Sequence, residues 1–262
     1  MYKHHKDSID NLSEYFKKDK SVIAVLIGGS IAKGCERVDS DIDAIVVVTD
    51  QRYNELYETY RLSETILGYC TYENGYFDIK YVNKGYLKSV ARNGSEPARV
   101  SFEKSWCIYS TDKEIESFIQ EIPVFQKQEK AKKMLAFYSA FELNNGYFWS
   151  ISNDNPYSKA RAITDIVLFG LRLILQDREI LFPCNKGLLS TVSKLGKEAK
   201  SIVEKAEKLI STGDTLSKDD FASSVMDFIE YEPPKEFSEV LTSYINNHEL
   251  WWYKNSPVIA EW

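Results

Sequence analysis

The sequence predicts an α+β fold in which a mixed sheet with flanking helices is followed by an all-helical second domain. Residues 1–122 alternate short runs rich in Val, Ile, Phe and Tyr with amphipathic stretches, a pattern typical of strands alternating with helices. Residues 123–262 instead carry apolar residues at spacings of three and four, and strand-like runs nearly disappear. The 262 residues, 44% of them hydrophobic, are enough to give each domain its own core.

The first domain is expected to contain four strands and three amphipathic helices. The strands are expected at residues 21–27, 41–48, 75–82 and 99–109, where β-branched and aromatic residues gather. The helices are expected at about 8–18, 51–62 and 83–92, where apolar residues recur on one face. Either Asp7 or Ser8 could cap the first helix, because both side chains accept hydrogen bonds from free backbone N–H groups.

The second domain is expected to begin near Ile122–Pro123 and to serve as a helical substrate-binding domain. Its helical stretches are expected at 129–153, 156–176 and 186–210. The tail is rich in tryptophan and tyrosine, at Trp251, Trp252, Tyr253 and Trp262. We expect these rings to pack on their own domain, and a homodimer contact is the alternative.

Charge and hydropathy exclude several classes of protein. A formal net charge of −6 argues against a nucleic-acid partner, because proteins that bind phosphate backbones usually present a basic surface. The longest apolar stretch, residues 166–175, is too short for a membrane span and contains Arg172. The first 20 residues have no apolar core of signal-peptide length. We therefore expect a cytoplasmic protein with no membrane contact.

A glycine-rich turn, Gly28–Ser30, follows the first expected strand and opens a short helix. Two glycines let the backbone approach a ligand closely, and the first N–H groups of a helix and a serine hydroxyl can bind phosphate. The segment is not a P-loop, because Gly34 is followed by Cys-Glu where a Lys-Ser/Thr pair is required. It is not a dinucleotide-binding turn either, because no GxGxxG is present. The sequence thus predicts a phosphate-binding turn of another type.

Carboxylates follow this turn at two places. Asp41 and Asp43 stand at the start of a Val/Ile-rich strand, and the two-residue period of a strand puts them on one face. Adjacent carboxylates repel each other unless a cation lies between them, and Mg²⁺ prefers such oxygen ligands. Asp78 lies in a later strand with Lys80 on the same face. Three carboxylates from neighbouring strands can hold two metal ions about 4 Å apart, as in phosphoryl transfer.

Each of these features also occurs in proteins without any site. A Gly-Gly-Ser turn is common, an Asp-x-Asp pair often lies on a solvated strand edge, and Asp39 is expected only to shape the turn. Their order and spacing together are far more specific than any one of them. We therefore predict a site in which Asp41, Asp43 and Asp78 are the catalytic metal ligands. The predicted nucleotide-binding residues are Gly28, Gly29, Ser30 and Lys80.

The run GGSIAKG, followed after four residues by DSDIDAIVVV and later by Asp78, resembles the nucleotidyltransferases of the DNA polymerase β superfamily. The resemblance covers about the first 110 residues and implies a nucleotidyltransferase-type mixed sheet. It implies that Asp41 and Asp43 bind both of two Mg²⁺ ions and that Asp78 completes the site. It also implies that Gly29 and Ser30 hold the β- and γ-phosphates of a nucleoside triphosphate, which we expect to be ATP.

The second half looks like the C-terminal domains of antibiotic nucleotidyltransferases, which modify aminoglycosides or lincosamides. The similar stretches are FELNN at residues 141–145 and LFPCNK at residues 181–186. The two resemblances imply transfer of a nucleoside monophosphate, expected to be AMP, to a hydroxyl of a small-molecule acceptor, with release of pyrophosphate. An acidic helical domain favours a cationic acceptor such as an aminoglycoside-like antibiotic.

Several alternatives remain open at this point. The general base could be Asp78, and Glu103 and Glu142 follow as candidates. The acceptor could be a protein, as in toxin–antitoxin adenylylation, although the long helical half counts against that class. Polynucleotide tailing is disfavoured by the acidic balance, and a silent binding module by the presence of all three carboxylates.

Overall fold

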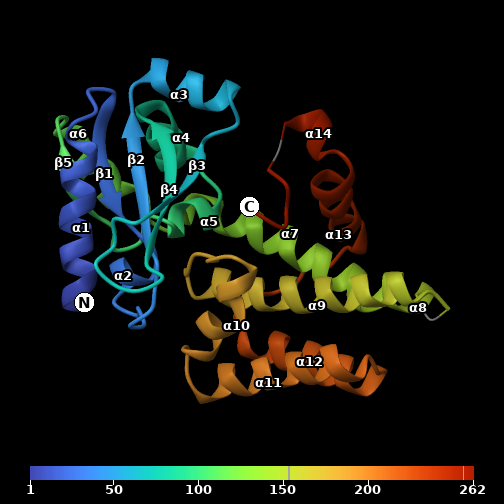
Figure 1. The fold of residues 1–262 in the computed structure, drawn as a ribbon. Coiled ribbons are helices and arrows are strands. Elements are labelled where there is room, and N and C mark those ends of the chain that lie inside the picture. The colour runs from blue at the N-terminus through green and yellow to red at the C-terminus, as the bar shows by residue number, and fades with distance from the viewer. Residues whose placement is uncertain (153, 256) are drawn as a thin grey trace. The chain divides into compact units, whose positions relative to one another are not determined.

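The computed structural model describes residues 1–152, 154–255 and 257–262, and the chain divides into two compact units (Figure 1). The first unit comprises Met1–Gly94 and Ala98–Val124. The second comprises Ser95–Pro97 and Phe125–Trp262. The first unit contains a mixed sheet with helices and the second is helical, which confirms the predicted α+β class.

The first unit is built on a five-stranded sheet with the order β3-β4-β2-β1-β5. Its strands are β1 (Val22–Ile27), β2 (Ile42–Val48), β3 (Ser63–Leu67), β4 (Tyr76–Asn83) and β5 (Trp106–Ser110). β2 and β4 are parallel, whereas the other neighbours are antiparallel. Three predicted strands agree with β1, β2 and β4 to within a residue. β3 was not predicted, because only Ile66 in it is buried and its other residues give no apolar alternation.

The fourth predicted strand, residues 99–109, is wrong in its first half. Residues Glu96–Val100 form the helix α5, a turn follows, and β5 begins only at Trp106. The reason is Arg99, which is fully buried and donates hydrogen bonds to the carbonyls of Gly94, Ala91 and Ile122 at 2.9–3.1 Å. A guanidinium that must satisfy three carbonyls in the interior requires a tightly turned chain around it.

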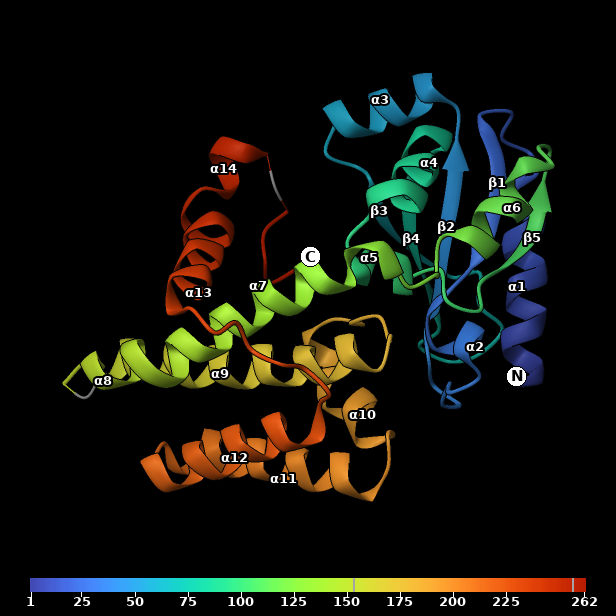
Figure 2. The ribbon, with the colours of Figure 1, turned by 180° about the vertical axis from the view of Figure 1, so that it is seen from behind.

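Helices cover both faces of this sheet (Figure 1, Figure 2). The helices of the first unit are α1 (Lys3–Phe16), α2 (Gly29–Lys33), α3 (Asp50–Glu58), α4 (Lys84–Asn93) and α6 (Glu114–Glu121). α1 packs on the face that carries Ala44, Val46 and Val48, and α4 and α6 pack on the face that carries Ile45 and Val47. Asp43 therefore points to the side of α4 and α6, because side chains alternate along β2.

The ends of these helices follow ordinary capping rules, with one departure from the prediction. Thr49 caps α3 by accepting a hydrogen bond from the backbone N–H of Arg52, and Asn83 caps α4 in the same way. α1 begins at Lys3, so the predicted cap at Asp7 or Ser8 is wrong. Ser8 is buried inside the helix, where its hydroxyl donates to the carbonyl of His4 at 2.7 Å.

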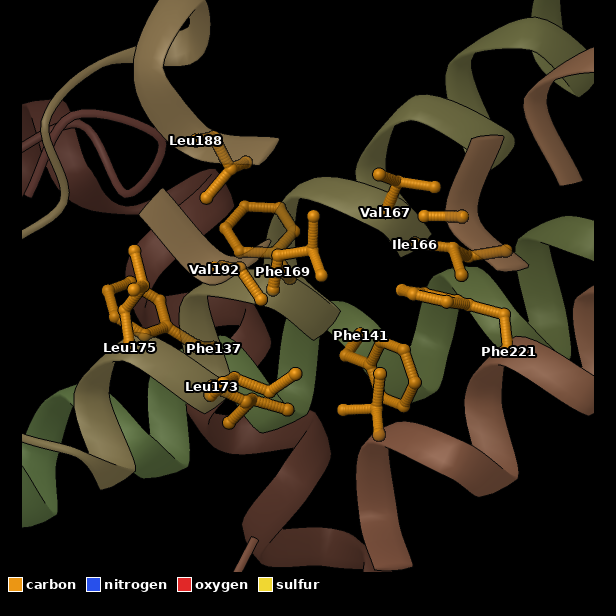
Figure 3. Packing of buried hydrophobic residues seen from close by; sticks show 14 of the residues in the cluster. Phe137, Phe141, Ile166, Val167, Phe169, Leu173, Leu175, Leu188, Val192 and Phe221 are labelled. Carbon is orange, nitrogen blue, oxygen red and sulfur yellow. The ribbon is translucent and has the colours of Figure 1, made fainter. Parts of the chain in front are cut away.

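The second unit consists of helices around an aromatic core. They are η1 (Lys127–Glu129), α7 (Lys130–Leu143), η2 (Asn144–Phe148), α8 (Trp149–Ile151), α9 (Pro156–Asp177), α10 (Asn185–Ser193), α11 (Lys197–Thr212), α12 (Thr215–Phe228), α13 (Phe237–Tyr244), η3 (Ile245–Glu249) and α14 (Trp251–Lys254). The predicted stretch 186–210 is divided by Gly196, whose φ of +125° favours glycine. Phe137, Phe141, Phe169 and Phe221 fill the interior (Figure 3). Asn153, the last residue of another predicted helix, lies outside the described residues.

A buried charge cluster fixes the ends of this unit. Arg172, 1% exposed, pairs with Glu96 at 3.3 Å and donates to the backbone carbonyls of Ile259, Ala260 and Trp262. Glu96 also accepts hydrogen bonds from the ammonium of Lys133 at 2.9 Å and from a backbone N–H at 2.8 Å. Burial lowers the pKa of Arg172 to about 10, and the Glu96 carboxylate opposes that shift.

The aromatic tail is therefore packed on its own unit only in part. Ile259 and Trp262 are buried, whereas Trp251, Trp252 and Tyr253 are exposed. Within the part of the chain that the structure describes, no helix has both the length and the apolar character that crossing a membrane requires.

The pH dependence of stability should carry a contribution from His248. Its ring stacks on Tyr244 with 4.0 Å between centroids, and burial lowers its pKa from 6.5 to about 4. Since the unfolded chain takes up this proton more readily, the free energy of unfolding should fall as the pH drops from 6.5 towards 4. His248→Phe removes the group, so the melting temperature of the variant should fall less steeply over that range. Parallel pH profiles of the two proteins in thermal denaturation would contradict this assignment.

Candidate active site

Three carboxylates meet at the start of the two parallel strands. β2 and β4 pair in a register that places Asp43 directly beside Asp78, and Asp41 immediately precedes β2. Carboxylate oxygens of Asp41, Asp43 and Asp78 all lie within 4.8 Å of one another. Asp41 and Asp43 are half-buried and Asp78 is exposed. The structure thus brings together the three residues that the sequence predicted as metal ligands.

The glycine turn lies directly against one of these carboxylates. The backbone N–H of Gly28 donates to the carbonyl of Asp43 at 3.0 Å, which extends the pairing of β1 with β2. Gly29 has φ +63°, and a Cβ atom there would lie 1.7 Å from Oδ2 of Asp43. Only glycine fits this position, because any side chain would displace the carboxylate.

A cavity of about 220 Å³ opens over these groups. It is lined by Gly28, Gly29, Lys33, Asp43, Ala44, Ile45, Ser63, Asp78, Lys80, Val100 and Ser101. Of the residues predicted to bind nucleotide, Gly28, Gly29 and Lys80 belong to this wall. Ser30 follows in the first turn of α2, and Asp41 joins the carboxylate cluster from beside the wall.

Two lysines supply positive charge beside the carboxylates. Lys80 follows Asp78 on the same face of β4 and is exposed. Lys33, which the sequence analysis missed, ends α2 and its Nζ lies 3.2 Å from Oε2 of Glu103. Lys33 could have been identified from its position four residues after Gly29, which places it one turn along the expected helix. Glu103 is thus ion-paired, which weakens its candidacy as a general base, whereas Glu142 lies in α7 of the second unit.

Two tyrosines hold the segment that carries Asp41. The hydroxyl of Tyr72 donates to the carbonyl of Ser40 at 2.6 Å. The hydrogen bond of Tyr76 to the Asp41 carboxylate raises the pKa of the Tyr76 phenol. Neither residue could be identified from the sequence, because their roles depend on how the loop before β4 folds back on residue 40.

The donor set of the cluster fits a hard divalent cation. All the converging side chains are carboxylates, and magnesium is bound in proteins through oxygen ligands of this kind. Three carboxylates at this separation also repel one another, so a bound cation removes an electrostatic cost that the protein otherwise bears. The residues present therefore suit Mg²⁺ better than a metal that needs nitrogen or sulfur ligands.

Comparison with known families agrees with this geometry. Residues 10–96 match the family described as polymerase beta nucleotidyltransferase. The matched segment contains the glycine turn and all three aspartates. The chain carries a nucleotidyltransferase domain of the polymerase β family. The resemblance of the first half to this superfamily is thereby confirmed.

Two solved structures are also similar to this chain. One is a nucleotidyltransferase-like protein from Exiguobacterium sibiricum 255-15, with 10% identity and a TM-score of 0.45 over 92% of this chain and 77% of that chain. The other is a spectinomycin adenyltransferase from Enterococcus faecialis, with ATP and spectinomycin. It has 14% identity and a TM-score of 0.36 over 84% of this chain and 99% of that chain. A search of curated proteins gave no match.

Gly29→Ala should weaken metal binding more than it weakens the fold. The added Cβ meets the Asp43 carboxylate, so we expect Mn²⁺ affinity, measured by electron paramagnetic resonance, to fall about tenfold or more. Gly34→Ala is the matched control, because Gly34 has φ +68° but open space where a Cβ would stand. Both variants bear similar backbone strain, and only the first should lose affinity. Equal affinities in the two variants would refute the steric argument.

Asp78→Asn should stabilise the metal-free protein while reducing its response to Mg²⁺. Removing one of three neighbouring carboxylates relieves repulsion, so the melting temperature without metal should rise by about 1–3 °C. The further rise on adding Mg²⁺ should shrink relative to wild type. Asp10→Asn, an exposed change in α1, should alter neither quantity. A destabilised Asp78→Asn variant with an unchanged Mg²⁺ response would contradict the assignment.

Proposed function

We propose that this protein transfers a nucleoside monophosphate, AMP in the first instance, from a nucleoside triphosphate to a hydroxyl of a small-molecule acceptor. The observation that carries the proposal is the cluster of Asp41, Asp43 and Asp78 beside the Gly28–Gly29 turn, within a polymerase β-type nucleotidyltransferase domain. Carboxylates for cations and a close backbone approach for phosphates are the two parts that such a transfer requires.

In this proposal the three aspartates hold two Mg²⁺ ions. When bound, the ions neutralise phosphate charge and lower the pKa of the attacking hydroxyl. Gly28, Gly29 and Ser30 contact the β- and γ-phosphates through backbone N–H groups and the serine hydroxyl. Because α2 has five residues, its dipole is small, and Lys33 and Lys80 supply most of the positive charge. Lys33 changes partner from Glu103 to phosphate at little cost, since exposed ion pairs contribute about 0–1 kcal/mol.

The reaction is an in-line displacement at the α-phosphorus. The acceptor oxygen forms a bond to the α-phosphorus, the bond from that phosphorus to the bridging oxygen breaks, and pyrophosphate leaves. The hydroxyl proton passes to a carboxylate, for which Asp78 is the candidate that lines the cavity and is exposed to an incoming acceptor.

The second part of the proposal concerns the acceptor. We assign residues 1–122 to catalysis and residues 123–262 to acceptor binding, because the helical unit has its own core and exceeds what nucleotidyl transfer requires. An aminoglycoside-like compound is the first acceptor class to test. The cytoplasm, which supplies ATP and Mg²⁺, is the proposed location.

Pyrophosphate release is the measurement that tests the function. Each of the four ribonucleoside triphosphates is combined with Mg²⁺ and with aminoglycosides and lincosamides, and one pair should give turnover. Asp43→Asn should lower that turnover about 1000-fold or more while leaving the melting profile cooperative, because it removes a metal-binding carboxylate. Full activity of Asp43→Asn would refute the mechanism. Turnover only in the presence of a protein fraction, with a mass shift of one partner, would replace the small molecule by a protein acceptor.

A further inference from the structure

The catalytic face of the sheet continues past β4 onto the edge strand β3. Ser63 pairs with Lys80 and Thr65 pairs with Asp78 in the antiparallel ladder. Side chains directly opposite each other in such a ladder lie on the same face. Ile66, the residue after Thr65, packs with the core on the other face, which agrees with this alternation. The exposed hydroxyls of Ser63 and Thr65 therefore extend the surface that carries the carboxylates.

A second cavity adjoins the first at this edge. It has a volume of about 370 Å³ and is lined by Tyr57, Glu58, Tyr60, Leu62 and Ser63. Ser63 lines both cavities and is therefore part of the wall of each. Ser63 lies one strand and two residues from Asp78, which corresponds to about 8 Å. That separation is on the scale of the ribose that links a phosphate to its base.

The aromatic wall of this cavity is largely exposed, and Tyr57 stacks on Tyr53 with 6.4 Å between the ring centroids. Tyr57 is 64% exposed and Tyr60 is 97% exposed, so neither ring contributes to a core. Tyr60 also has φ +58°, a conformation that favours glycine or asparagine. The chain turns there because Arg61 N–H donates to the carbonyl of Leu56 at 2.8 Å. A glycine would make this turn with less backbone strain. The Tyr60 side chain therefore keeps a strained conformation without contributing to the packing of a core.

We propose that the Tyr57–Tyr60 cavity receives the nucleobase of the triphosphate. This inference rests on the proposed function and assigns the part of its site that faces the base. Exposed tyrosine rings stack on any base, and the Glu58 carboxylate can accept a hydrogen bond from a base N–H, whether an exocyclic amino group or a ring N–H. The phosphates stay with the lysines and glycines of the first cavity, and the ribose passes over Ser63.

Calorimetric titration with two probes tests whether the base and the phosphates bind in different cavities. The first probe is Mg²⁺ with α,β-methylene-ATP, which carries a base and cannot be cleaved at the reactive bond. The second is Mg²⁺ with tripolyphosphate, which has no base. Tyr60→Ala and Tyr57→Ala should each weaken the first probe about tenfold, because base–aromatic stacking is lost, and should leave tripolyphosphate unchanged. Tyr60→Phe should retain wild-type affinity for both.

Matched controls separate this inference from the function on which it rests. Tyr15→Ala, a partly exposed tyrosine of α1 on the opposite face of the sheet, should change neither affinity. Asp43→Asn should weaken both probes. Unchanged binding of the ATP analogue to Tyr57→Ala and Tyr60→Ala, or equal loss for both probes, overturns the base site alone. Failure of wild type to bind either probe contradicts the proposed function and the base site together.

Discussion

The pairing register of β2 with β4 is the constraint on which the candidate site depends. It sets Asp43 beside Asp78, and a slip of one residue would turn Asp78 and Lys80 to the opposite face. The core prevents that slip. Phe77 and Ile79 alternate with Asp78 and are fully buried against the α1 side, so moving them into solvent would expose large apolar side chains while burying charges. The hydrophobic pattern of β4 thus helps to place Asp78 beside Asp43.

Several features of the same site lower the stability of the folded protein. Asp43 occupies the space that a side chain at residue 29 would need, so the turn accepts the entropy cost of glycine in the unfolded chain. Three carboxylates converge in this cluster, and Tyr72 and Tyr76 bind the segment that carries Asp41. Lys33 is held by Glu103 in a partly exposed pair that a stronger anion can displace. These arrangements are costly in a folded protein, and the binding of cations and phosphates proposed above would offset that cost.

The features of the fold and site that could be predicted are those marked by a short stretch of sequence. β1, β2 and β4 are apolar runs, and the aspartates follow the glycine turn at a fixed spacing, so both were found from the sequence. β3 could not be found, because an edge strand that exposes Ser63, Thr65 and Leu67 lacks an apolar pattern. α5 was missed because the buried Arg99 selects a turned chain over a strand-like composition. The cavity of Tyr57 and Tyr60 depends on a strained turn and on the position of β3, neither of which has a sequence signature.

Glu96 has a consequence for how this protein can be divided. Ser95–Pro97 lie within the stretch of chain that otherwise builds the sheet unit, yet they belong to the helical unit through the contacts of Glu96 with Arg172 and Lys133. A fragment that starts at Phe125 would lack Glu96. Lys133 would keep its ion pair with Glu129 at 3.3 Å, whereas the buried Arg172 would lose its ion pair. Breaking a buried pair in this way costs about 3–5 kcal/mol, a large share of the stability of an ordinary domain. The helical half is therefore a folding unit only when the sheet half supplies three of its residues, and no single cut separates the chain into two self-sufficient pieces.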